Sequence, residues 1–88
     1  MNLFKEVAML TAHTVTVSLP DMETIKAFVA ILCRYPQEMD LRSSRYVVDA
    51  KSILGIMSLG PQPSVFLDIY GEDAESVAEA IADFRVES

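Results

Sequence analysis

The stretch EMDLRSSRYVVDA, residues 38–50, decides the fold class of this 88-residue chain. Two short runs typical of strands, Glu38 to Ser43 and Arg45 to Ala50, follow each other with Ser43-Ser44 as the turn between them. No helix separates them, so they predict an antiparallel pair. This adjacency excludes a doubly wound sheet in which every strand is parallel.

Strand patterns also precede and follow this hairpin. The run from Thr11 to Leu19 alternates between two faces, with apolar Val15, Val17 and Leu19 on one of them. After the loop Pro-Gln-Pro, the run from Ser64 to Tyr70 has the same strand character, and Gly71 ends it. The sequence therefore predicts four strands.

Three helices are expected between and after these strands. The first opens at Pro20 and Asp21 and stops before Pro36, with one apolar stripe facing the core. The second, Lys51 to Leu59, is capped by Ser52 and ended by Gly60. The third runs from Glu72 to Val86. The expected core residues of the first and third helices are Ile25, Phe28, Val29, Leu32, Ala74, Val77, Ala78, Ile81 and Phe84.

The resulting order is β, α, β, β, α, β, α. It predicts an α+β fold in which a four-stranded antiparallel sheet is covered on one face by three helices. At this length, residues 1–88 form one small domain. Residues 1–10 lie outside the scheme as an N-terminal extension. Leu3, Phe4 and Val7 suit either a helical turn or a strand, and the sequence does not decide between them.

Composition excludes several classes of function. No apolar run approaches the ~18–20 residues of a membrane span, and the N-terminus does not resemble a signal peptide, so a cytoplasmic protein is expected. The net charge is -6 and the basic residues are scattered, which disfavours nucleic acid. With Cys33 alone, neither a disulfide nor a cysteine metal cluster is expected, and no cofactor is implied. No catalytic set or phosphate-binding loop is present either, so we do not expect an enzyme.

The run Lys51 to Gly60, KSILGIMSLG, is long and specific. Together with the element order, it resembles HPr, the small histidine-containing phosphocarrier family of the bacterial phosphoenolpyruvate–sugar phosphotransferase system. The resemblance extends more weakly from about Thr11 to Val86. It implies the open-faced sandwich fold of that family and a role connected with sugar phosphotransfer.

The family's phosphate acceptor is a histidine just before the first helix, followed two residues later by an arginine. Aligned without gaps, Asp21 stands at the histidine position and Glu23 at the arginine position; a shorter loop leaves no counterpart at all. Asp21 could form an acyl phosphate, but two carboxylates would repel an arriving phosphate dianion. Its alternative role is an ordinary N-cap of the helix. His13 is the other candidate acceptor, with a packed strand residue as its alternative role.

The second helix carries more apolar side chains than one buried face can use. Ile56 and Leu59 can face the sheet, whereas Ile53, Leu54 and Met57 form a separate face beside Gly55. These four residues predict a partner-binding patch. The alternative is that residue 53 or 54 completes the core. In HPr proteins the corresponding surface docks enzymes and transcription regulators, so the resemblance implies such partners.

Ser52 matches the serine that a dedicated kinase phosphorylates in Gram-positive HPr proteins. The resemblance therefore implies regulatory phosphorylation, and a plain N-cap is the alternative. Three hypotheses follow. The chain is a non-carrier regulator or adapter, a phosphocarrier that uses Asp21 or His13, or a self-associating structural protein. The sequence leaves the oligomeric state open.

Overall fold

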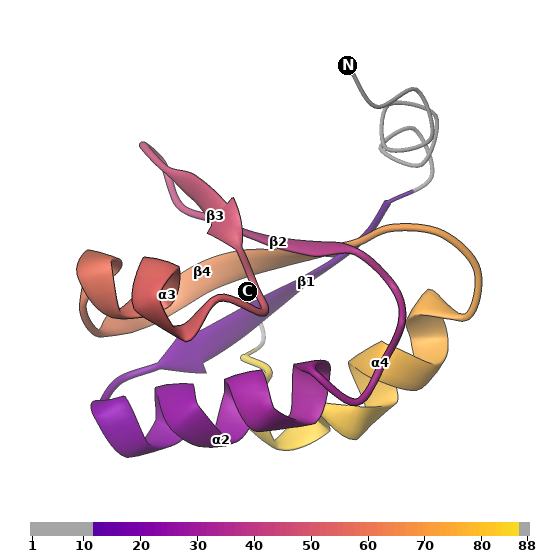
Figure 1. Cartoon of the computed structure of the whole chain (residues 1–88), viewed down its shortest axis with the longest axis horizontal. Helices are drawn as coiled ribbons and strands as arrows, with labels where there is room; N and C mark the ends of the chain where they lie inside the picture. The colour runs from indigo at the N-terminus through magenta and orange to yellow at the C-terminus, as the bar shows by residue number, and fades with distance from the viewer. Residues whose placement is uncertain (1–11, 87–88) are drawn as a thin grey trace.

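The computed structural model describes residues 12–86, so the interpretation of residues 1–10 lies outside the described residues. Four strands form one sheet in the order β1-β4-β2-β3, and all three pairings are antiparallel (Figure 1). The strands are β1 (His13–Leu19), β2 (Met39–Arg42), β3 (Val47–Asp49) and β4 (Gln62–Ile69). The predicted antiparallel sheet and the predicted order of elements are confirmed.

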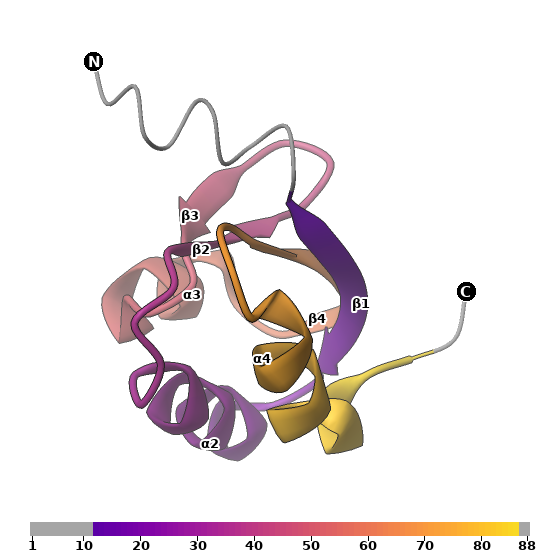
Figure 2. The same ribbon diagram turned by 90° about the vertical axis from the view of Figure 1, so that its right-hand side faces the viewer.

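Three α-helices accompany the sheet: α2 (Met22–Leu32), α3 (Ile53–Leu59) and α4 (Ala74–Ala80). Seen end-on, α2 and α4 lie side by side across one face of the sheet, and α3 lies beside α2 near β3 (Figure 2). All three helices contribute to a single apolar core. Phe28 of α2, Ile56 of α3 and Val77 of α4 are fully buried in the same cluster as Val17 and Leu67 of the strands.

Strand alternation separates two faces of the sheet. Val15, Leu67 and Leu41 lie opposite one another in neighbouring strands and face the core. One residue along, Thr14, Asp68 and Asp40 form the corresponding row, and the period of two places it on the opposite face. The predicted inward face of β1, with Val15, Val17 and Leu19 buried, is confirmed.

A polar network occupies that opposite face. Asp68 Oδ2 accepts a hydrogen bond from Arg42 Nε at 2.9 Å, and Oδ1 accepts one from Thr14 Oγ1 at 2.6 Å. Burial raises the pKa of the Asp68 carboxyl, but the hydrogen bonds from Arg42 and Thr14 outweigh it, and the net pKa lies below the ordinary value. The Arg42 guanidinium also lies over the Phe66 ring, 4.8 Å from its centroid.

Tyr70, directly after β4, is buried and donates a hydrogen bond from its hydroxyl to Asp40 Oδ2 at 2.9 Å. Burial raises the pKa of the Tyr70 phenol well above its ordinary value, and the hydrogen bond to Asp40 raises it further. The phenol therefore stays protonated as a donor at physiological pH.

The turn of the β2–β3 hairpin is longer than predicted. Residues 43–46 connect the strands, rather than Ser43-Ser44 alone. The Ser43 amide donates to the Tyr46 carbonyl at 2.8 Å, and the Ser43 hydroxyl accepts from the Tyr46 amide at 3.1 Å. A serine side chain that bonds its own turn in this way stabilises a wider loop than a two-residue turn.

β4 begins two residues earlier than predicted, so Gln62 and Pro63 belong to a strand and not to a loop. Proline lacks the amide hydrogen that a sheet needs, and it is tolerated in strands mainly at their starts and at bulges. Here the register shifts between the pairs Val17–Val65 and Leu19–Gln62, so two β4 residues lie opposite one residue of β1. The bulge explains how Pro63 fits.

The predicted final helix from Glu72 to Val86 is wrong in its extent. α4 covers Ala74–Ala80, a short 3₁₀ helix η1 covers Ala82–Phe84, and Ile81 lies between them outside helical geometry. The chain then becomes extended: Arg85 bridges to Val17, and the Val86 amide donates to the Thr16 carbonyl at 3.0 Å. Pairing with β1 replaces the last helical turn.

Candidate functional site

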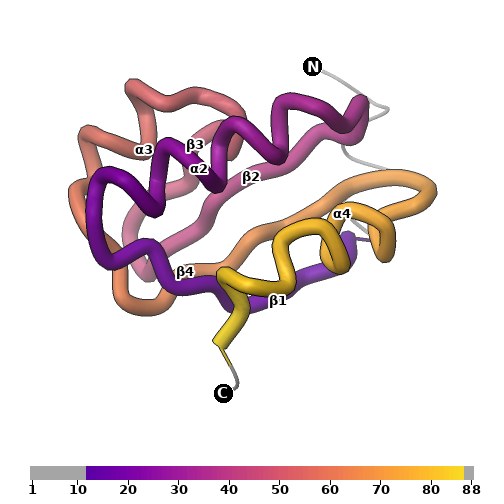
Figure 3. Tube along the Cα trace, turned by 90° about the horizontal axis from the view of Figure 1, so that it is seen from below, coloured from indigo at the N-terminus to yellow at the C-terminus, as the bar shows by residue number. Residues whose placement is uncertain are grey.

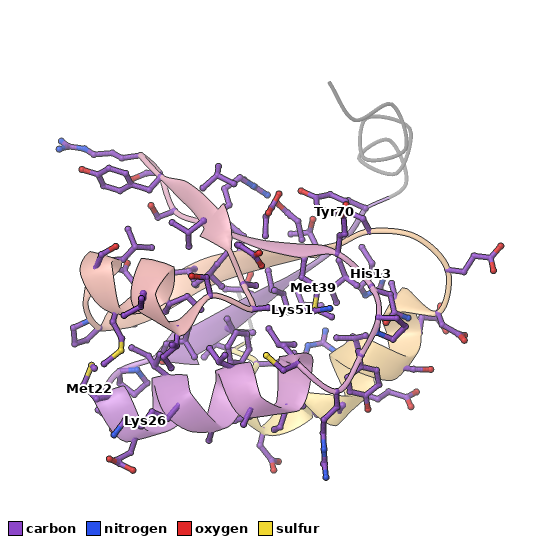
Figure 4. The ribbon with its side chains drawn as sticks, in the orientation of Figure 1. His13, Met22, Lys26, Met39, Lys51 and Tyr70 are labelled. Carbon is purple, nitrogen blue, oxygen red and sulfur yellow. The ribbon has the colours of Figure 1, made fainter. Side chains whose placement is uncertain are left out.

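The start of α2 and the whole of α3 lie at the same end of the molecule (Figures 1 and 3). β1 runs toward this end, and the chain enters α2 there, while α3 contacts α2 after the β2–β3 hairpin. Figure 4 shows Met22, the first residue of α2, beneath α3 at this end. The fold thus places α3 and the start of α2 at one end of the molecule, while Lys51, just before α3, lies beside the end of α2, where its carbonyl oxygen is 3.8 Å from Cys33 Sγ.

Asp21 is the N-cap of α2. Its Oδ1 accepts hydrogen bonds from the Thr24 amide at 2.8 Å and from the Thr24 hydroxyl at 2.7 Å. These bonds lower the pKa of the exposed Asp21 carboxyl, so the group is ionised at neutral pH. The predicted capping role is confirmed. Glu23, two residues later, is exposed, and its carboxylate lies 3.6 Å from the Lys26 ammonium.

His13 lies at the other end of β1 and pairs with Ile69 of β4. Six residue steps along the strand separate it from Leu19, a distance of about 20 Å at ~3.3 Å per residue. Figure 4 shows His13 correspondingly far from Met22. The expected packed position in the strand is confirmed, because the side chain is half-buried on the core face beside Val15. The structure does not bring His13 near Asp21 or α3.

Ser52 is the N-cap of α3, and its Oγ accepts a hydrogen bond from the Gly55 amide at 3.2 Å. Gly55 also permits a close approach: a Cβ added there would lie 3.3 Å from Ser52 Oγ and 3.6 Å from Val48 Cβ. Gly60 ends the helix with a φ of 76°, a conformation that glycine adopts without strain. The predicted cap and terminus of this helix are confirmed.

The apolar side chains of α3 divide between the core and the surface. Ile56 is fully buried, as expected, whereas Leu59 is only half-buried. Ile53 packs against the core with part of its surface exposed, Met57 is half-buried, and Leu54 is 77% exposed. The patch of Ile53, Leu54, Gly55 and Met57 is therefore accessible, and Leu54 is its most exposed member.

A groove beside this helix was not anticipated from the sequence. It has a volume of about 550 Å³ and lies between the hairpin loop and the end of α3. Its lining comes from residues 43–46 and Val48 of the hairpin, residues 58–59 at the end of α3, and Gln62. Leu59 lines the groove, which explains why it is less buried than Ile56. The groove forms where the hairpin loop meets the end of α3 and the start of β4, so no local sequence pattern signals it.

Within residues 12–86, no group of three or more His, Cys, Asp or Glu side chains is arranged to hold a metal ion. No helix in the same range is both long and apolar enough to cross a bilayer. The described residues include two capped helix starts, an exposed apolar patch and a groove.

Comparison with known proteins identifies the fold and the family. Residues 12–86 match the family model described as PTS HPr component phosphorylation site. HPr-C-His from Thermoanaerobacter tengcongensis is 28% identical with a TM-score of 0.70, over 81% of this chain and 88% of that one. Phosphocarrier protein HPr from Bacillus anthracis strain Ames is 27% identical with a TM-score of 0.69, over 85% and 98% respectively.

A third similar structure is Crh, a catabolite repression protein of Bacillus subtilis, described as a dimer with a swapped domain. It is 25% identical with a TM-score of 0.58, over 81% of this chain and 88% of that one. No curated protein sequence matches the chain. The family match spans every described element, and the solved structures of HPr proteins share the fold. The chain therefore belongs to the HPr family of the phosphotransferase system.

Proposed function

We propose that this chain is a cytoplasmic regulator or adapter of the HPr family that docks protein partners through α3 and does not relay phosphoryl groups on a histidine. Phosphotransferase-system enzymes, a serine kinase or a transcription regulator are the partner classes that family membership suggests. The role would be gated by phosphorylation of Ser52. The observation that carries the proposal is that the Asp21 carboxylate caps the start of α2, the place where the family's phosphate acceptor would lie.

At that start, the Asp21 carboxylate already accepts a hydrogen bond from the Thr24 amide, which lowers the pKa of the carboxyl and keeps it ionised. A phosphoryl group arriving there would meet this charge and the nearby carboxylate of Glu23, and it would compete for an amide already in use. The single histidine lies at the far end of β1. Both observations support a role without a histidine carrier at this helix.

The patch on α3 supports docking. Leu54 exposes 77% of its surface with Ile53 and Met57 on the same side of the helix, and a partner that covers Leu54 would remove a large apolar side chain from water. Burial of a leucine contributes roughly 1.5–3 kcal/mol, which corresponds to at least about tenfold in affinity. Met57 adds an adaptable contact at the edge of the patch.

Ser52 is placed to alter this surface. Its side chain is half-exposed at the N-cap, and it directly precedes Ile53 of the patch. Phosphorylation would add a charge of about -1.5 to -2 beside the apolar residues. A partner with cationic groups facing Ser52 would bind the phosphorylated chain more tightly. A partner with apolar or anionic groups there would bind it more weakly.

The proposal is tested by intact mass after two incubations. One contains ATP and an HPr serine kinase; the other contains phosphoenolpyruvate and the first enzyme of the sugar system. We expect one added phosphate with ATP, absent in Ser52→Ala, and none with phosphoenolpyruvate. Phosphate added from phosphoenolpyruvate would refute the non-carrier role. Absence of phosphate after incubation with ATP would refute regulation through Ser52.

Docking is tested by the initial rate at which the kinase modifies Ser52. Leu54→Glu should lower that rate at least tenfold. Val86→Glu is the matched control, because Val86 is another exposed apolar residue, 38% accessible, outside α3. Equal rates for the two variants, both with unchanged circular dichroism, would show that Leu54 is not a contact.

Two alternatives have some support. The family match is described by a phosphorylation site, which favours a carrier that uses Asp21 or His13. If phosphoenolpyruvate does label the chain, loss of label in Asp21→Ala or in His13→Ala identifies the acceptor. The swapped dimer of Crh favours self-association. A dimer in size-exclusion chromatography that dissociates in Leu54→Glu would support the structural role.

A further inference from the structure

The charge of the chain is unevenly distributed. Residues 41–67, which hold the end of β2, β3, α3 and most of β4, contain the cations Arg42, Arg45 and Lys51 but only one carboxylate, Asp49. This segment has a balance of +2 in a chain of -6, so the remaining residues carry -8. Figures 1 and 3 show β3 and α3 together at one end of the molecule. That end is electrostatically distinct from the rest.

The same segment holds most of the large apolar side chains that are exposed among the described residues. Five large apolar side chains are exposed among the described residues, and all but Val86 lie between positions 41 and 67. The four are Tyr46, Val47, Leu54 and Phe66, with exposures between 41% and 77%. A surface that combines apolar side chains with cations, on an otherwise anionic molecule, is typical of an interaction site.

The groove between the hairpin loop and α3 is lined by both apolar side chains and a cation. Tyr46, Val48 and Leu59 supply its apolar lining, and Arg45 and Ser58 are among its polar residues. Its volume of about 550 Å³ lies within the usual range of ligand pockets, ~300–1,000 Å³. The groove can therefore receive a large apolar side chain together with its polar neighbours.

Arg45 is the cation available for such a ligand. Arg42 is already bound to Asp68, and the Lys51 ammonium donates to the Tyr35 carbonyl. Within residues 12–86, the Arg45 guanidinium has no hydrogen bond or ion pair, and the residue is exposed in the hairpin loop. A guanidinium beside an apolar groove favours a carboxylate, which it can hold with two parallel hydrogen bonds.

We propose that this groove binds an acidic segment of a protein partner, with an apolar side chain between Tyr46 and Leu59 and a neighbouring carboxylate on Arg45. The charge of -8 elsewhere repels polyanions such as nucleic acid or an anionic membrane, and one available guanidinium is too few to hold them. A short acidic peptide needs only the Arg45 guanidinium and the apolar groove beside it. The inference rests on the proposed docking function, since Leu54 and Ser58 lie one turn apart on α3 and continue the patch into the groove.

The probe is the capped peptide EDLFED, titrated into the ¹⁵N-labelled full chain. We expect amide shifts that saturate at residues 43–48 and 58–62, with affinity falling as salt rises. KRLFKR tests the charge, EDSSED tests the apolar anchor, and vesicles with anionic lipid test a membrane. Neither control peptide nor the vesicles should shift these amides. Equal binding of KRLFKR, or binding to the vesicles alone, would overturn the proposal.

Variants localise the effect. Arg45→Glu should weaken EDLFED at least tenfold, whereas Arg34→Glu, the same charge reversal at an exposed arginine after α2, should change it less than twofold. Equal effects of the two variants, or no saturable shift in the groove for the unmodified chain, would refute the site. The kinase rate of Leu54→Glu reports on the patch independently, so failure of the groove and failure of the docking function are distinguishable.

Discussion

Asp68→Asn removes the charge at the centre of the network on the sheet face opposite the helices. The Asp68 side chain is only 10% exposed, and it accepts hydrogen bonds from Arg42 at 2.9 and 3.2 Å and from Thr14 at 2.6 Å. Asparagine has nearly the same volume, and its carbonyl keeps one acceptor. The substitution therefore tests the charge and the second acceptor without opening a cavity.

The magnitude follows from the hydrogen bonds. A hydrogen bond to a charged group contributes roughly 1.5–3 kcal/mol net. Arg42 is 43% exposed, so water recovers part of this contribution in the variant. We expect Asp68→Asn to lower the free energy of unfolding by about 2 kcal/mol. For a domain of this size that corresponds to a decrease in Tm of roughly 8–16 °C.

Urea unfolding followed by circular dichroism at pH 7 measures the loss. Asp83→Asn is the matched control, because Asp83 is exposed in η1 and its substitution changes the net charge by the same amount. The control should lie within about 0.5 kcal/mol of the unmodified chain. Equal losses for the two variants would refute the reasoning, because net charge and not the buried network would then set the effect.

The effect of Asp68→Asn should also depend on pH. The pKa of Asp68 is lowered in the folded state, so the folded chain binds the proton less readily than the unfolded chain does. The stabilisation is fully present above the unfolded pKa of about 3.9 and is lost as pH falls through the folded pKa. The difference between the two chains should shrink below about pH 4. A difference that persists unchanged at lower pH would contradict the assignment.

Three further predictions concern α3 and Tyr70. Ile56→Ala should cost about 3 kcal/mol of unfolding free energy because the side chain is fully buried, whereas Leu54→Ala should stay within about 0.5 kcal/mol; urea unfolding measures both. Ser52→Ala should cost about 1 kcal/mol by losing the cap, whereas Ser52→Asp should not, since both residues are good N-caps; thermal unfolding compares them. Tyr70 should ionise well above the ordinary pKa, measured by absorbance at 295 nm. Its stabilisation is complete below the unfolded pKa of about 10 and is lost as pH rises further, and Tyr70→Phe removes that dependence.

Each of these has an outcome that contradicts it. Similar losses for Ile56→Ala and Leu54→Ala would place Leu54 in the core. A loss in Ser52→Asp as large as in Ser52→Ala would show that the hydroxyl acts in some other way than as a cap. A Tyr70 phenol that ionises at the ordinary pKa of a tyrosine in the folded chain would contradict its burial.

Local patterns predicted most of the architecture. The alternation in β1 and the stripe of α2 are set by neighbours within a few residues, and both are confirmed. The start of β4 was missed because Pro63 reads as a loop residue, and only the bulge opposite β1 makes it acceptable. The last helix was predicted too long because pairing of Arg85 with Val17, 68 positions earlier, outweighs helix propensity.

The candidate site was predicted in part. The caps at Asp21 and Ser52 are local motifs, and both are present as expected. The groove and the network around Asp68 join residues that are distant in the chain. Thr14 and Asp68, for example, are 54 positions apart, so a local sequence pattern cannot predict their contact. Such contacts depend on the strand order, which the sequence pattern alone did not supply.

Pairing of residues 85 and 86 with β1 bears on how the protein behaves at high concentration. β1 and β3 are the two outer strands of the sheet, and an outer strand with free amides and carbonyls is a template for intermolecular pairing. β3 has only three residues, and the end of the chain occupies part of the outer side of β1. A chain that ends at residue 84 would lose that cover. Loss of residues 85–88 should therefore raise the propensity to form fibrils before it affects the fold.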